Sequence, residues 1–142
     1  MTKIKLQDSF KEFCLKKKFE INNQQKEIIT LLNKFLNEKE NFFSKFFNKR
    51  KKLCFYLHGK VGVGKTMILN FAYDSLKIKK HRLHFNEFMI NFHDFRHEKK
   101  DNSTIKNFVK DLKKRYDLIY LDEFQVTNIV DAMILGKLFE II

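Results

Sequence analysis

One eight-residue stretch constrains this chain more than any other. Residues 59–66 read Gly-Lys-Val-Gly-Val-Gly-Lys-Thr and fit the phosphate-binding pattern G-x-x-x-x-G-K-[ST] at every specified position. The apolar run 53–57 before it predicts a buried strand, and residues 67–72 after it continue as a helix. A glycine-rich loop between a strand and a helix predicts a nucleotide-binding site, and the alternative is a glycine-rich turn that matches by chance.

Each part of this loop has an expected role. Backbone N–H groups of the loop and of the helix N-terminus surround a phosphate, and glycines permit the close approach. Lys65 is expected to reach the β- and γ-phosphates of ATP, and the Thr66 hydroxyl is expected to bind Mg²⁺. The residues predicted to bind the cofactor are Gly59, Lys60, Val61, Gly62, Val63, Gly64, Lys65 and Thr66.

An acidic pair near the end of the chain predicts the rest of the site. The apolar run 118–121 leads into Asp122 and Glu123. Because ligands bind at the carboxyl ends of parallel strands, Asp122 is predicted to bind Mg²⁺, mainly through a bound water. Glu123 is predicted to orient and deprotonate a water, which makes it catalytic together with Lys65 and favours ATP hydrolysis over phosphoryl transfer. The alternative is that both acids only cap the next helix.

Apolar spacing predicts the remaining elements. Helices are expected within 1–20, from 23 to about 47, from the loop to about 77, from 86 to about 95, from 103 or 104, and from 128 onward, with a short strand at 83–85. Asn86 is the expected N-cap of its helix, and Asn128 with Asp131 is expected to cap the last one. This order predicts an α/β fold with a mostly parallel sheet flanked by helices, comprising a helical region 1–48 and a P-loop ATPase core 49–142.

The charge of the chain raises the question of a polyanionic partner. The formal net charge is +12, and the tracts 49–52 and 79–82 are strongly basic. Such a charge suggests nucleic acid or an anionic membrane surface. However, Lys, Asn, Ile and Phe are all abundant while Pro and Trp are absent. An AT-rich coding sequence produces this composition everywhere, so we expect an ordinary solvated surface.

The cysteines and apolar runs indicate the compartment. Cys14 and Cys54 lie far apart and form no C-x-x-C pair, which predicts neither a disulfide framework nor a zinc knuckle. The longest apolar runs are too short for a transmembrane segment, and the first residues lack an apolar signal core. A cytoplasmic location is therefore expected.

Two histidines at helical spacing raise the possibility of zinc. His93 and His97 lie at i and i+4, close to the H-E-x-x-H arrangement of zinc proteases. The acid between them is Asp94, whose shorter reach weakens a general base, and no third ligand is apparent downstream. The sequence therefore does not favour a zinc site.

The two phosphate-related motifs occur together with further motifs that resemble one family. These are the stretch 81–85 with Phe88, Met89 and His93, and Asp122-Glu123-Phe124 followed by Asp-Ala-Met-Ile-Leu-Gly at 131–136. Over most of residues 20–142 the pattern is similar to that of the AFG1-like ATPases. The resemblance implies an AAA+ ATPase that uses ATP and Mg²⁺ and acts on a protein client.

The resemblance also implies a biological setting. Bacterial members of the family act at the division ring near the inner membrane, and mitochondrial members act in protein quality control. For this chain it implies cell division, a division-ring protein as client, a homo-oligomer when full length, and peripheral association with the membrane. A nucleic-acid-binding loader ATPase and a nucleotide-binding fragment without turnover remain alternatives.

One further match and two departures complete the comparison with the family pattern. Gln25 matches a family glutamine before the ATPase core and is expected to face solvent, with a contact to the adenine edge as the alternative. Asn128 stands where the family commonly has an acid, and both residue types cap helices well. The sequence also lacks the family's next strand with its polar sensor, its arginine finger and its lid helices. It therefore resembles the first half of a member, with an incomplete core whose exposed apolar strands favour aggregation.

Overall fold

The two halves of the chain form separate units in a computed structural model that describes residues 5–38, 54–60, 62–99 and 103–142. One unit comprises Met1–Leu76 and the other Lys77–Ile142, and each is described by itself. The domain boundary predicted between residues 48 and 49 lies outside the described residues.

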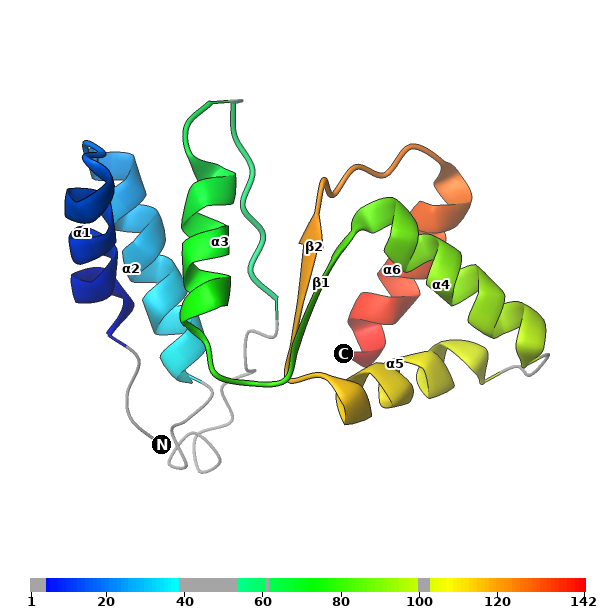
Figure 1. Cartoon of the computed structure of the whole chain (residues 1–142). Coiled ribbons are helices and arrows are strands. Elements are labelled where there is room, and N and C mark those ends of the chain that lie inside the picture. Colours follow the sequence, from blue (N-terminus) through cyan, green and yellow to red (C-terminus); the bar gives the residue numbers. More distant parts are fainter. Residues whose placement is uncertain (1–4, 39–53, 61, 100–102) are drawn as a thin grey trace. The chain divides into compact units, whose positions relative to one another are not determined.

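Three helices build the first unit: α1 (Leu6–Lys17), α2 (Asn23–Glu38) and α3 (Lys65–Ser75) (Figure 1). These helices agree with the predicted ones over the described residues, since apolar residues recur every three or four positions and line one face of each. The predicted continuation of the second helix to about residue 47 lies outside the described residues. Those faces meet in a core whose buried members are Leu6, Phe10, Cys14, Ile29, Leu32, Ile68 and Ala72. The phosphate-binding loop therefore leads into a helix that is anchored by an apolar core.

The strand predicted before the loop does not form among the described residues. Residues 54–57 are not in a strand, and Leu53 lies outside the described part. A strand needs a neighbour that exchanges backbone hydrogen bonds, and the described residues of the first unit contain no other strand. Phe55 packs against the helical core instead, with its ring centroid 5.6 Å from that of Phe35. Apolar character alone therefore does not make this segment a strand.

The second unit contains a two-stranded parallel sheet. Strands β1 (Lys80–His84) and β2 (Leu118–Asp122) pair in register from Lys80↔Leu118 to His84↔Asp122. Between them the chain passes through α4 (Phe85–Glu98) and α5 (Thr104–Arg115). The parallel order and the mixed helix and strand content agree with the predicted α/β class.

One helix start and one strand of the second unit differ from the prediction. A strand was predicted at 83–85, but β1 begins at Lys80 and ends at His84, whose partner Asp122 is the last paired residue of β2. The chain turns into α4 there, with His84 as N-cap, so the prediction of Asn86 as N-cap was wrong. The start of α5 with Ser103 as N-cap agrees with the prediction.

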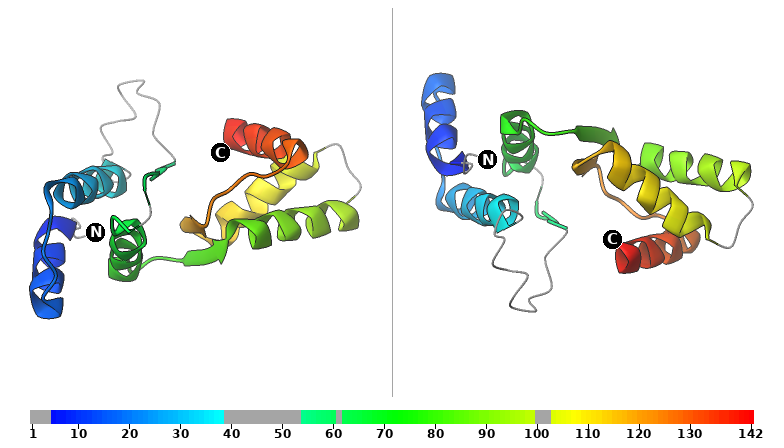
Figure 2. Two further views of the ribbon diagram at one scale, coloured as in Figure 1. Left: turned by 90° about the horizontal axis from the view of Figure 1, so that it is seen from above. Right: turned by 90° about the horizontal axis from the view of Figure 1, so that it is seen from below.

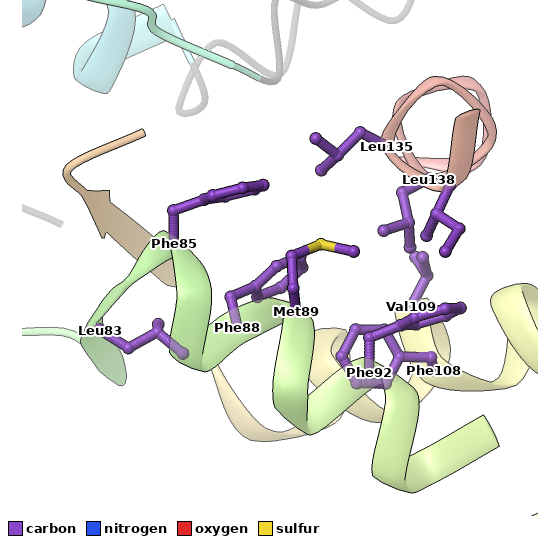
Figure 3. Close-up of a cluster of buried hydrophobic side chains, with 10 residues drawn as sticks. Leu83, Phe85, Phe88, Met89, Phe92, Phe108, Val109, Leu135 and Leu138 are labelled. Carbon is purple, nitrogen blue, oxygen red and sulfur yellow. The ribbon is translucent and has the colours of Figure 1, made fainter. Parts of the chain in front are cut away.

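The last helix, α6 (Ile129–Ile141), completes the unit, and α5 lies between α4 and α6 in both views of Figure 2. Figure 3 shows how side chains from β1 and all three helices converge in the core. The buried members of this core are Leu83, Phe85, Phe88, Met89, Phe92, Phe108, Val109, Ile134, Leu135 and Leu138. The crossover helices are thereby held against the sheet, which positions the end of β2.

Helical spacing predicts that Ile129, Met133, Ile134 and Leu138 of α6 share one apolar face. Ile134 and Leu138 are buried, but Ile129 and Met133 are 76% and 62% exposed. The reason is that α6 is apolar on most of its sides, so its spacing does not define one buried face. At 13 residues α6 is short, and no helix in the described ranges is both long and apolar enough to cross a bilayer.

Candidate functional site

The phosphate-binding loop runs directly into α3. Gly62 and Gly64 have φ angles of 86° and 83°, in the left-handed region that glycine adopts without strain. Gly64 is the N-cap of α3, and Lys65 and Thr66 are its first two residues. Because the first N–H groups of a helix have no partner within it, they are donors for an anion. Val61 lies outside the described residues.

The Lys65 ammonium lies over the beginning of the loop. Its Nζ donates hydrogen bonds to the carbonyl oxygens of Gly59 and Lys60, at 2.8 and 2.6 Å. An anionic phosphate oxygen is a stronger acceptor for an ammonium than a neutral carbonyl oxygen. The position of Lys65 is therefore compatible with transfer of its hydrogen bonds to a bound phosphate.

Gln25 of α2 lies beside the loop and is buried, with 9% exposure. Its Nε2 donates to the carbonyl oxygen of Val63 in the loop, at 3.4 Å. The expectation that Gln25 faces solvent was wrong. Asn22 and Gln25 form a reciprocal cap at the start of α2, and this cap turns the glutamine side chain back toward the helix N-terminus. The N-x-x-Q spacing contained a signal for that cap, which the sequence reading missed.

Asp122 ends β2 in an ion pair with Arg82 of β1. Arg82 is paired in register with Tyr120, so its side chain lies on the same face of the sheet as that of Asp122, two residues farther along β2. The guanidinium also lies over the Tyr120 ring, 5.0 Å from the centroid. The hydrogen bond from Arg82 lowers the pKa of Asp122, and the Glu123 N–H contributes in the same direction, while burial opposes both. The result is a firmly ionised carboxylate at the end of the strand.

Glu123 leaves the strand in a strained conformation. Its φ is 51°, a left-handed value that is costly for a residue with a side chain. Its carboxylate is 80% exposed and has one oxygen 3.7 Å from His84 Nδ1. An exposed carboxylate beside a half-buried acid is chemically suited to accept a proton from water.

The two acids do not cap the following helix. Asn128 is the N-cap of α6, and its Oδ1 accepts a hydrogen bond from the Asp131 N–H at 2.8 Å. This agrees with the predicted cap and removes the alternative in which Asp122 and Glu123 serve only as caps.

The two residues predicted to bind Mg²⁺ carry oxygen donors, and each is described within its own unit. Thr66 and Asp122 offer hydroxyl and carboxylate oxygens, the ligand type that Mg²⁺ prefers. Each Asp122 oxygen accepts one hydrogen bond, Oδ2 from Arg82 and Oδ1 from the Glu123 N–H at 3.1 Å. A carboxylate oxygen has further acceptor capacity, so a metal-bound water can still be bound. Thr66 belongs to the first unit and Asp122 to the second, and each is positioned within its own unit.

One of the two histidines at i and i+4 has a structural partner. His93 Nε2 lies 3.3 Å from Asp131 Oδ1 and links α4 to α6. His97 is exposed, and the described residues contain no cluster of three side chains that could bind a metal ion. Cys14 and Cys54 are free thiols. Of the two histidines at helical spacing, His93 therefore has a structural role between helices.

Known proteins that resemble this chain point to one family. A family model described as AFG1-like ATPase matches residues 4–142. Lactation elevated protein 1 homolog B of Danio rerio is 34% identical over 117 residues, which cover 73% of this chain and 23% of that protein. Cell division protein ZapE of Escherichia coli K12 is 37% identical over 87 residues, which cover 60% of this chain and 23% of that protein. The chain thus spans less than a quarter of the length of these relatives. No solved structure matches it.

Proposed function

This chain belongs to the AFG1-like ATPase family, and from that premise we propose that its loop 59–66 binds the phosphates of Mg²⁺·ATP. For the whole protein we propose an AAA+ fold, ATP hydrolysis and action on a protein client. The similarity to ZapE, which is named a cell division protein, supports a role in cell division.

The geometry of the loop supports ATP binding most directly. Left-handed glycines at 62 and 64 bring the chain to the start of α3, where unpaired helix N–H groups favour an anion. The Lys65 ammonium lies within hydrogen-bonding distance of two loop carbonyls, so a phosphate in the loop would find a cation already present. Backbone donors and one cation together are the features that a triphosphate requires.

The remaining residues have proposed roles around the same phosphates. Thr66 and Asp122 would bind Mg²⁺, which neutralises phosphate charge and polarises the γ-phosphoryl group. Asp122 is kept ionised by Arg82 for this purpose. The exposed Glu123 carboxylate would orient and deprotonate the attacking water, and Lys65 would stabilise charge on the phosphoryl oxygens.

Substitution of Lys65 tests the proposal. We expect Lys65→Ala to weaken binding of Mg²⁺·ATP about 10- to 100-fold, because a charge-assisted hydrogen bond to phosphate is lost. The matched control is Lys60→Ala, which removes the same charge from the same loop but keeps the Lys60 backbone N–H and carbonyl, because a loop residue at this position contacts phosphate through its backbone. Titration with a fluorescent ATP analogue in the presence of Mg²⁺ measures both affinities. Equal affinity of Lys65→Ala and the unmodified chain would refute the proposal.

The described residues do not favour a nucleic-acid loader. The basic tract 49–52 lies outside them. Within the tract 79–82, the Arg82 guanidinium is bound to Asp122 and stacked on Tyr120, which directs it toward the sheet. We therefore propose one function for this chain, and that function is nucleotide binding.

A further inference from the structure

We infer that Gln25 is a positioning residue, which sets the conformation of the phosphate-binding loop from outside the loop. This inference rests on the proposed binding of nucleotide at residues 59–66. It concerns a residue of α2, 34 positions before the start of the loop in the sequence.

The two ends of the Gln25 amide have different partners. Oε1 accepts a hydrogen bond from the Asn22 N–H at 3.2 Å, which closes the cap of α2. Nε2 donates to the Val63 carbonyl oxygen at 3.4 Å. One side chain thereby joins a rigid helix start to the middle of the loop. The cap uses the acceptor and the loop uses the donor, so a substitution can remove one function and keep the other.

The packing of Gln25 against Gly64 shows how close this approach is. A Cβ atom placed on Gly64 would lie 2.8 Å from Gln25 Nε2, a separation that real Cβ contacts do not show. Gly64 has a φ of 83°, and this left-handed backbone is what requires glycine there, whereas an added Cβ would displace the end of the Gln25 side chain. The glutamine therefore covers the residue that precedes Lys65, and its position limits the conformations that the loop can adopt.

A direct contact of Gln25 with the adenine base is the competing role. The side chain is 91% buried among the cap and the loop, as its exposure of 9% indicates, and leaves little surface for a base. A positioning role acts through the loop and affects every ligand that carries the phosphates. A base contact affects only ligands that carry adenine. Inorganic tripolyphosphate and GTP therefore distinguish the two roles.

The test uses Gln25→Glu in the full 142-residue chain. Glutamate keeps the acceptor that closes the cap, as Glu commonly does at this position, but it cannot donate to Val63. The matched control is Gln24→Glu, which adds the same charge to the neighbouring, exposed position in the same helical turn. Gln25→Met, of similar length and without charge, removes both the donor and the cap acceptor, so an effect shared by the two Gln25 variants is not caused by the added charge. Thermal unfolding of each variant reports whether it remains folded.

Glycine amide resonances report the loop conformation without any nucleotide. The chain has four glycines, of which three lie in the loop and Gly136 lies in α6, where it serves as an internal reference. We expect Gln25→Glu and Gln25→Met to shift or broaden the resonances of Gly62 and Gly64 while Gly136 is unchanged. Gln24→Glu should leave all four resonances in place. Unchanged loop glycines in both Gln25 variants would overturn the inference.

Ligand affinity provides the second measurement. We expect both Gln25 variants to bind Mg²⁺·ATP and tripolyphosphate about five- to tenfold more weakly, as the loss of one positioning hydrogen bond implies. A loss of preference for ATP over GTP with unchanged tripolyphosphate binding would overturn the positioning role in favour of a base contact. If the unmodified chain binds neither ligand, the proposed function fails, and the glycine resonances alone decide whether Gln25 sets the loop.

Discussion

The phosphate-binding loop and the acidic end of β2 hold their functional side chains by different means. In the loop, Lys65 donates to backbone carbonyl oxygens and Gln25 holds the chain through a neutral amide. At the end of β2, Asp122 is held by the charge of Arg82. The loop should therefore respond to changes in backbone geometry, and the strand end should respond to charge and pH.

The two units also have separate apolar cores. Substitutions in these cores should have the largest effect on stability, and they test whether the two units unfold independently. Phe10 and Phe92 are each 1% exposed, and each packs edge-on against another phenylalanine, Phe71 and Phe108 respectively. We expect Phe10→Ala and Phe92→Ala each to destabilise its own unit by about 3–5 kcal/mol through cavity formation and lost burial.

Glycine amide resonances locate this damage. Phe10→Ala should shift the three loop glycines, and Phe92→Ala should shift Gly136 of α6. Phe139→Ala is the control because that side chain is 48% exposed and should change little. If Phe92→Ala also shifts the resonances of the loop glycines, the two units fold as one cooperative body, and their cores are not independent.

A glycine pair tests the dependence of the loop on backbone geometry. Gly64→Ala should cost about 1–2 kcal/mol for the left-handed backbone alone, and its Cβ would also meet Gln25 at 2.8 Å. Gly136→Ala is the matched control. Apart from its chain neighbours and its own helix backbone, no heavy atom of the described residues lies within 4 Å of its added Cβ. Because Gly136 lies inside α6, the substitution should stabilise by about 0.5–1 kcal/mol. Urea unfolding measures both, and equal signs for the two variants would contradict the geometric account.

The ion pair at the end of β2 gives the smallest effect and the clearest dependence on pH. The folded-state pKa of Asp122 is lowered by Arg82, so the pair stabilises the fold above the unfolded pKa of the carboxyl group. That stabilisation is lost as pH falls through the lower, folded-state pKa. Because the Arg82 side chain is 38% exposed, we expect Arg82→Gln to cost less than about 1 kcal/mol at neutral pH.

Measurement of stability against pH checks this sign. The difference between Arg82→Gln and the unmodified chain should be constant near neutral pH, begin to shrink near the ordinary carboxyl pKa of about 4, and disappear as pH falls through the lower folded-state pKa of Asp122. Arg115→Gln is the control, since it breaks the Arg115–Asp111 pair on the surface of α5. A difference for Arg82→Gln that persists unchanged in acid would show that packing on Tyr120, and not charge, is the contribution of Arg82.

The amino-acid sequence by itself determined the features that depend on residues close together in the chain. Each of three features can be recognised within a segment of at most eight residues: the loop pattern 59–66, the acids 122 and 123, and the cap at Asn128. The helices follow from apolar spacing over three or four residues. Local hydrogen bonding and local burial account for these features, so a single sequence contains enough information for them.

Tertiary structure decided the features that join distant segments. Gln25 meets Val63 across 38 positions, His93 meets Asp131 across 38, and Arg82 meets Asp122 across 40. Spacing shows that a residue lies on one face of a helix or strand, but it does not show which segment packs against that face. The missing strand at 54–57 has the same cause, because a strand depends on a partner elsewhere in the chain.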